Sequence, residues 1–89
     1  MDAAMKTFQV HLNSIDSVKQ FVAVAERQSC EIDVCSGRYV VDGKSMLGLF
    51  SLDLSSPVDV RCYGEDADAE RFYTELSALL DVKKTEEEK

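Results

Sequence analysis

The sequence predicts one α+β domain, with the element order β-α-β-β-α-β-α and helices covering one face of a four-stranded sheet. Three observations favour this class. The 89 residues suffice for one domain and not for two. Stretches with apolar residues at every second position alternate with stretches at helical spacing. One proline and four glycines form no Pro- or Gly-rich stretch, so no linker divides the chain. We place the domain at residues 1–82 and expect the charged tail, 83–89, to fray.

The first strand is predicted over Thr7–Leu12, because the apolar residues of TFQVHL alternate with polar ones. In this pattern His11 points away from the core. An exposed histidine on a strand is most often a plain solvated side chain.

An amphipathic helix follows the first strand and ends near Gln28. Asn13 or Ser14 can cap it, and Asp16 in the first turn suits the positive end of the helix dipole. A capping box from Ser17 to Gln20 is the alternative start. Its predicted apolar face consists of Ile15, Val18, Phe21, Val22 and Ala25.

The middle of the chain predicts a hairpin and a short helix. Glu31–Ser36 alternates as a strand, Ser36 and Gly37 form the turn, and Arg38–Val41 returns. Ser45 can cap a short helix over Met46–Leu52. We expect this helix to contribute Met46, Leu47, Leu49 and Phe50 to the core.

A fourth strand and a last helix complete the pattern. Pro57 precedes the alternating run Val58–Tyr63, and a proline at the first position of a strand removes no needed hydrogen bond. Asp66 is a good cap for the last helix. The apolar stripe of that helix is predicted to be Ala69, Phe72, Leu76, Leu79 and Leu80.

Composition excludes several classes of function. The net charge is −7, and the ten Lys and Arg are scattered, which argues against binding to nucleic acid or to an anionic membrane surface. No apolar run approaches the length of about 18 residues that a membrane helix needs. The first ten residues lack the pattern of a signal peptide, so we expect a cytoplasmic protein.

Cysteine and histidine offer little chemistry at these spacings. Cys30, Cys35 and Cys62 form no C-x-x-C pair and fall in or beside strand-like runs, which is typical of buried free thiols. With one histidine, a zinc site is not expected, nor is a serine or cysteine nucleophile with a histidine base. We therefore expect no metal, no cofactor and no enzymatic activity.

The stretch from Glu31 to Leu54, EIDVCSGRYVVDGKSMLGLFSLDL, resembles HPr, the histidine-containing phosphocarrier family of the bacterial sugar phosphotransferase system. Lys44 and Ser45 followed by MLGLFSL fit that family's signature, and VDVRCYGED fits its last strand and final helix start. The similarity runs from Thr7 to Leu80. It implies an open-faced sandwich with a four-stranded antiparallel sheet and three helices on one face.

The chain departs from the family at the phosphorylation motif. HPr proteins carry the phosphoryl group on a histidine in a G-[LI]-H-A-R-P-A motif, and the matching region here runs from Asn13 to Lys19. Asp16 then takes the place of the histidine, after Ile15, while the Arg and Pro are missing. His11 lies about five positions too early and is only a remote candidate. Phosphohistidine transfer needs an imidazole nucleophile and donors for the phosphoryl oxygens.

Asp16 and Ser45 each have a structural and a functional interpretation. Asp16 is a first-turn carboxylate worth about 0.3–1 kcal/mol, a fixed mimic of a phosphorylated histidine's charge, or an acyl-phosphate acceptor. Ser45 is a helix cap worth about 1 kcal/mol. In Gram-positive relatives the matching serine is phosphorylated by a regulatory kinase, so the resemblance also implies a phosphoserine site.

Two classes of function follow from the resemblance. The first is a regulatory or protein-interaction module without carrier activity, which binds partners through Ile15, Asp16, Met46, Leu47, Leu49 and Phe50. Its partners would be a kinase, phosphotransferase components or a transcription regulator, and the domain would be a monomer. The second is a phosphocarrier with a displaced acceptor, His11 or Asp16. A small fold with an unrelated partner is the third possibility.

Overall fold

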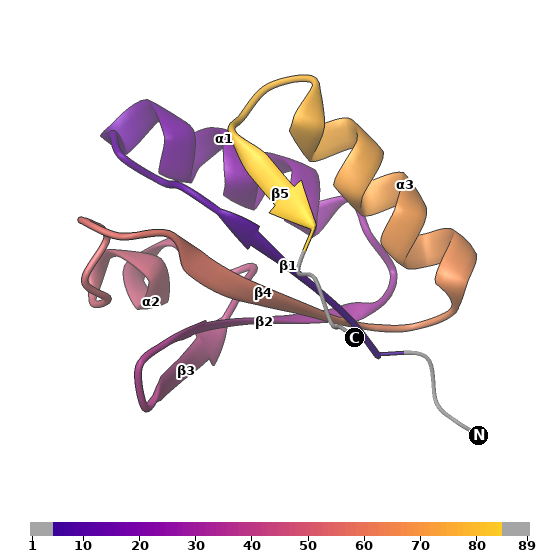
Figure 1. Cartoon of the computed structure of the whole chain (residues 1–89), viewed down its shortest axis with the longest axis horizontal. Coiled ribbons are helices and arrows are strands. Elements are labelled where there is room, and N and C mark those ends of the chain that lie inside the picture. Colours follow the sequence, from indigo (N-terminus) through magenta and orange to yellow (C-terminus); the bar gives the residue numbers. More distant parts are fainter. Residues whose placement is uncertain (1–4, 85–89) are drawn as a thin grey trace.

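The structure is a computed structural model that describes residues 5–84, and it is an open-faced sandwich. One antiparallel sheet with the strand order β3-β2-β4-β1-β5 is covered on one face by helices (Figure 1). The predicted fold class is confirmed. The elements are β1 (Met5–Val10), α1 (Ile15–Glu26), β2 (Glu31–Ser36), β3 (Tyr39–Asp42), α2 (Met46–Phe50), β4 (Val58–Tyr63), α3 (Asp66–Ser77) and β5 (Val82–Lys84).

The fifth strand corrects the prediction for the end of the chain. β5 pairs with β1, with Val82 opposite Val10 and Lys84 opposite Phe8. The tail therefore begins later than residue 83, because Lys83 and Lys84 belong to the sheet; residues 85–89 of the predicted tail lie outside the described residues. Two adjacent lysines carry no alternation of apolar and polar residues, which is why the pattern did not predict a strand.

One apolar core lies between the sheet and the helices. Phe72 of α3 is its centre, with its ring centroid 5.7 Å from those of both Phe8 and Phe21 in edge-on contacts. All of the helices contribute to this core, α2 through Leu49 alone. Its largest fully buried side chains are Phe21, Phe72, Leu12, Ile32, Leu49, Leu76, Val10, Val18, Val24, Val34, Val58 and Val60.

Helix α1 begins where the sequence places it, with Ser14 as the N-cap. The capping box runs from Ser14 to Ser17, so the alternative box from Ser17 to Gln20 is wrong. Ile15 was predicted to lie on the apolar face of the helix and also to be a partner-binding residue, and it is 64% exposed. As the first residue of the helix it lies where the chain has just left the sheet, so the helical period alone does not place it over the core.

Helix α2 is shorter and less buried than the sequence predicts. It ends at Phe50 instead of Leu52, with Ser45 as the predicted N-cap. Only Leu49 faces the core, and the side chains of Met46, Leu47 and Phe50 are exposed. A helix of one turn and a half can direct only one narrow face inward, so four apolar residues among its five positions cannot all be buried.

Helix α3 fits its prediction except at its two ends. The N-cap is Glu65, one residue before the predicted Asp66, and the backbone N–H of Glu65 donates to Asp68 Oδ2 at 3.1 Å. Ala69, Phe72 and Leu76 are buried, but Leu79 follows the helix and is exposed. Among residues 5–84 no helix is long and apolar enough to cross a membrane.

The three cysteines are free and buried, as predicted. Cys35 neighbours Val34 on β2, and because Val34 is in the core, strand alternation places Cys35 on the other face of the sheet. Burial raises the pKa of the Cys35 thiol, against the opposing effect of the Arg61 charge. Cys30 and Cys62 lie on the core side instead.

Candidate functional site

The candidate site is the start of α1 and the part of α2 that lies beside it. Two serines fix the backbone there. The N–H of Ser17 donates to Ser14 Oγ at 3.0 Å, and the N–H of Ser14 donates to Ser17 Oγ at 3.0 Å. The hydroxyl of Ser17 also donates to the Ser14 carbonyl at 2.7 Å. These reciprocal bonds hold Ile15 and Asp16 in the first turn with their side chains exposed.

A shallow hollow lies between this turn and the end of α2. Ile15 and Phe50 face it from the two helices, so residues far apart in sequence meet there. The residues lining the hollow are Leu12, Asn13, Ser14, Ile15, Phe50 and Leu54. Neither Leu12 nor Leu54 was predicted from the sequence to be a site residue. An apolar residue in a loop, such as Leu54, could have indicated a contribution to this surface.

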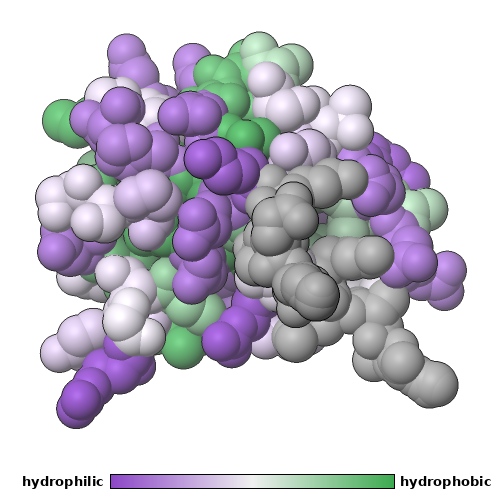
Figure 2. Space-filling view, viewed as in Figure 1, coloured by the Kyte–Doolittle hydropathy of each residue, from purple (hydrophilic) through white to green (hydrophobic). Residues whose placement is uncertain are grey.

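Exposed apolar side chains continue from the hollow along α2. Leu47 is 84% exposed, and Met46 and Phe50 are four residues apart, on one side of the helix. Ile15, Met46, Leu47 and Phe50 are here called the docking surface. Figure 2 shows the face of the molecule seen in Figure 1, where apolar residues reach the surface between hydrophilic ones. Large exposed apolar side chains gathered near one another are typical of protein-binding sites.

Leu49 does not belong to the docking surface. It was predicted to bind partners, but its side chain is fully buried in the core. A fully buried side chain cannot contact a partner, so the structure does not support the prediction for Leu49, whereas Met46, Leu47 and Phe50 on the same helix are exposed. The helical period explains why Leu49 is buried while its neighbours are exposed, because Leu49 is the one residue of this short helix that points at the sheet.

His11 lies in a different place from the other candidate residues. It follows β1 instead of lying within it, and its backbone N–H donates to the Asp81 carbonyl at 3.1 Å, next to the start of β5. Its side chain is half-buried and lines a small hollow with Gln9, Val10, Pro57, Asp81 and Lys83. That hollow shares no residue with the one beside Asp16.

Ser45 occupies the N-cap of α2 with its side chain half-buried. Its Oγ accepts a hydrogen bond from the backbone N–H of Gly48 at 3.1 Å. A Cβ on Gly48 would lie 3.2 Å from Val41 Cβ and 3.3 Å from this same Oγ, so glycine lets the helix pack tightly on β3. The structural role predicted for Ser45 is thus observed.

Metal chemistry finds no support among the residues that the structure describes. No group of three or more His, Cys, Asp or Glu side chains there could hold a metal ion. Asp16 accordingly lacks the neighbouring carboxylates that an acyl-phosphate site with Mg²⁺ would use. The chemistry of this site is therefore that of an apolar surface beside a helix start that carries one carboxylate.

Comparisons with known proteins agree with this fold. The family model described as "PTS HPr component phosphorylation site" matches residues 16–81. The structure is similar to the crystal structure of HPr-C-His from Thermoanaerobacter tengcongensis, with a TM-score of 0.65 and 25% identity, over 86% of this chain and 90% of that one. No curated protein matches the sequence.

The open-faced sandwich, with an exposed surface where its first helix begins, defines a small HPr-like domain of the phosphotransferase-system type. The matched residues are well over half of the chain. The chain belongs to the PTS HPr family. Proteins of this family are phosphocarriers that interact with other proteins of the phosphotransferase system.

Proposed function

We propose that this chain is a regulatory or protein-interaction module of the HPr family that carries no phosphoryl group on histidine. One observation carries the proposal: the sequence has a single histidine, His11, and it lines a hollow separate from the start of α1. Phosphohistidine transfer needs an imidazole at that helix start. The match to the family model begins at residue 16, so it does not extend to the residues before the helix.

The electrostatics of the helix start support the same proposal. The N–H of Ser17 is already bonded to Ser14 Oγ, so this donor is not available to a transferred phosphoryl group. Asp16 places a permanent negative charge in the first turn, where the helix dipole favours it. A partner that recognises the phosphorylated form of an ordinary HPr would meet a fixed anion beside an apolar surface here.

Binding through the docking surface is the proposed mode of action. Ile15, Leu47 and Phe50 present apolar area without any rearrangement of the core, and Asp16 adds a charge at the edge. An apolar centre with a charged rim is the usual composition of a protein interface. We propose that the module acts in the cytoplasm as a monomer and that it is not an enzyme.

Phosphoryl transfer is tested with phosphoenolpyruvate, enzyme I and a radioactive label. An authentic HPr is the positive control, and His11→Ala and Asp16→Asn are the variants. We expect no label on the wild type under conditions that load the control. Acid-labile label that disappears in His11→Ala, or label that disappears in Asp16→Asn, would instead support a carrier with a displaced acceptor.

The docking surface is tested with a matched pair of leucines. Leu47 and Leu79 are both exposed, but Leu79 lies after α3 and outside the docking surface. With enzyme I as the probe in isothermal titration, Leu47→Asp is expected to weaken binding about tenfold or more, since a central apolar contact is worth over 1 kcal/mol. Leu79→Asp should bind like the wild type. Equal effects of the two variants, or no binding by the wild type, contradict the proposal.

Phosphorylation of Ser45 is proposed as the regulatory input. Ser45 is the N-cap of α2 and directly precedes Met46 of the docking surface. A phosphate on its hydroxyl would add about two negative charges beside the apolar side chains of that surface. Incubation with an HPr kinase and ATP should give acid-stable phosphoserine on the wild type and none on Ser45→Ala. An unmodified wild type contradicts this part of the proposal.

A further inference from the structure

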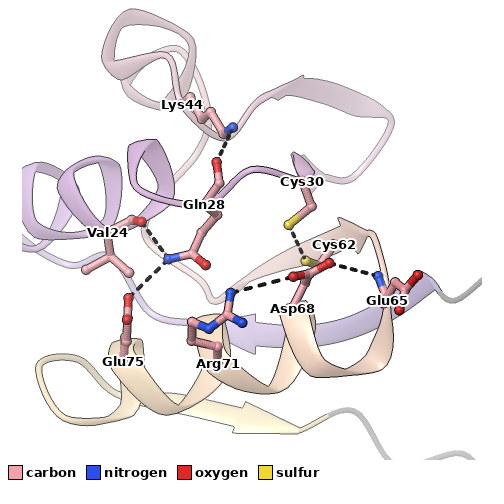
Figure 3. A network of polar contacts seen from close by, with 9 residues as sticks. All are labelled: Val24, Gln28, Cys30, Lys44, Cys62, Glu65, Asp68, Arg71 and Glu75. Atoms are coloured by element: carbon pink, nitrogen blue, oxygen red, sulfur yellow. Dashed lines mark hydrogen bonds and ion pairs between the residues drawn. The ribbon is translucent and has the colours of Figure 1, made fainter.

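Two thiols from distant parts of the chain meet near the start of α3. Cys30 directly precedes β2, Cys62 lies in β4, and their Sγ atoms point toward each other at 3.2 Å (Figure 3). The pairing of β2 with β4 places Ile32 opposite Cys62. The register of the sheet therefore brings the two sulfur atoms together, and neither serves in the docking surface.

The end of β4 is shaped to admit Cys30. A Cβ on Gly64 would lie 2.8 Å from Cys30 Cβ, so a side chain at this position would push the cysteine away. The turn after Gly64 is held by the Glu65 N–H, which donates to Asp68 Oδ2, and Asp68 in turn pairs with Arg71 at 3.5 Å. Figure 3 shows these contacts beside the Cys62 thiol.

The segment before Cys30 is anchored as well, through the buried Gln28. Its side-chain amide donates to the Val24 carbonyl and to Glu75 Oε1, both at 3.0 Å. Its backbone carbonyl accepts from Lys44 Nζ at 2.9 Å. The connection from α1 to β2 is thus tied to α3 and to the residue before Ser45, and Cys30 is held two residues further on (Figure 3).

We propose that Cys30 and Cys62 are a modification site, at which a two-electron oxidant such as hydrogen peroxide forms a reversible intramolecular disulfide. The bond would tie the α1–β2 connection to the end of β4. Only about 1 Å of approach separates the observed sulfur contact from the S–S distance of a disulfide. This inference does not rest on the proposed function.

The reaction balances with peroxide as the oxidant. Cys30 is the more exposed of the two residues, 8% against 0% for Cys62, so its sulfur attacks the peroxide. An S–O bond forms, the O–O bond breaks, and one water leaves. The Cys62 sulfur then displaces the oxygen, forming the S–S bond and releasing a second water with the Cys62 proton. Each sulfur loses one electron and the peroxide gains two. An external dithiol reverses the reaction by exchange.

The order of attack agrees with the acidity of the buried thiol. Burial, with a further contribution from the contact with Cys30, raises the pKa of Cys62 to about 12. Cys62 is therefore protonated at neutral pH and is a poor nucleophile toward peroxide, so it takes the second step, in which it loses its proton as its sulfur attacks the neighbouring Cys30 sulfur at 3.2 Å. Cys35 takes no part, because strand alternation places it on the other face of the sheet.

The experiment compares reduced and peroxide-treated protein by intact mass and by peptide mapping without reductant. The wild type should lose two hydrogen atoms and yield one reducible peptide pair joining Cys30 to Cys62. Cys35→Ala, the matched control for removing a buried thiol, should behave in the same way, while Cys30→Ala should form no intramolecular bond. Hydrogen exchange should slow around residues 28–31 and 62–65 in the oxidised wild type.

Three results would overturn the inference. They are a disulfide that includes Cys35, a disulfide between two copies of the chain, and oxidation of Cys30 to sulfinic acid with Cys62 left as a thiol. The mapping of the wild type decides among them by itself. The conclusion therefore survives even if one of the alanine variants fails to fold.

Discussion

Replacing Ser14 by alanine separates the contribution of the capping box from the rest of the fold. The change removes the acceptor for the Ser17 N–H, which the native structure bonds at 3.0 Å. The reverse bond, from the Ser14 N–H to Ser17 Oγ, remains, because it uses the backbone of residue 14. Only one of the two reciprocal bonds is lost, so the expected cost is about 1 kcal/mol of unfolding free energy.

Urea denaturation followed by circular dichroism measures this cost. For a domain of this size about 1 kcal/mol corresponds to a fall in melting temperature of roughly 4–8 °C. Hydrogen exchange supplies a local readout, since the amide of residue 17 should lose its protection first. Ser14→Asp should keep the stability, because its carboxylate still accepts the bond and suits the helix dipole.

The matched control is Ser77→Ala, at the end of α3. The exposed Ser77 hydroxyl donates to the Thr74 carbonyl at 2.9 Å. The substitution therefore removes one serine hydrogen bond but leaves the start of the helix unchanged. This variant should stay within about 0.5 kcal/mol of the wild type. If Ser14→Ala and Ser77→Ala lose the same stability, the capping box does not stabilise α1 as argued here.

Three further changes test the core and the buried thiols. Phe72→Ala removes the central ring of the core and should lower the unfolding free energy, measured by urea denaturation, by about 3–5 kcal/mol. The control Leu79→Ala, at an exposed residue, should lower it by less than about 0.5 kcal/mol. Similar values for both variants would refute the assignment of the core. Gly64→Ala forces a Cβ against Cys30 and should cost about 1–3 kcal/mol by the same measurement, and an unchanged midpoint would show that the turn relaxes freely. The pKa of Cys62 is raised from 9.0 to about 12, so between these pH values the folded protein keeps a proton that the unfolded chain releases. The resulting contribution to stability is complete below pH 9.0 and is lost as the pH rises toward 12. Urea titrations at a series of alkaline pH values should therefore show a shallower pH slope for Cys62→Ala than for the wild type, and equal slopes would contradict this.

Local patterns in the sequence were enough to predict most of the secondary structure. The strand Val58–Tyr63 was predicted at its observed bounds, because each of its residues follows a strict alternation. The cap Ser45 was also predicted, and Ser14 was among the caps proposed for the first helix, since a capping serine acts on residues only three positions away. Such short-range features need no knowledge of the tertiary structure.

Errors in the candidate site arose where tertiary packing decides the outcome. Leu49 was assigned to the partner-binding residues, yet it is buried, because the path of the chain relative to the sheet decides which side of a short helix faces the core. Ile15 was assigned both to the apolar face of the first helix and to the partner-binding residues, and it is exposed. His11 was predicted to lie within a first strand that ends at Leu12, whereas the actual strand ends at Val10. The approach of Cys30 to Cys62 depends on the register of β2 against β4, which spacing along the chain does not encode.

The short strand β5 has a consequence for the solubility of the protein. It covers the edge of β1 that β4 leaves free, and two of its three residues are lysines. A short, charged edge strand resists pairing with another chain, whereas the uncovered edge of β1 would present unpaired backbone groups as a template for it. Removing the chain from residue 82 onward would therefore leave the core nearly intact but expose the β1 edge, so that the truncated domain becomes prone to sheet-to-sheet aggregation.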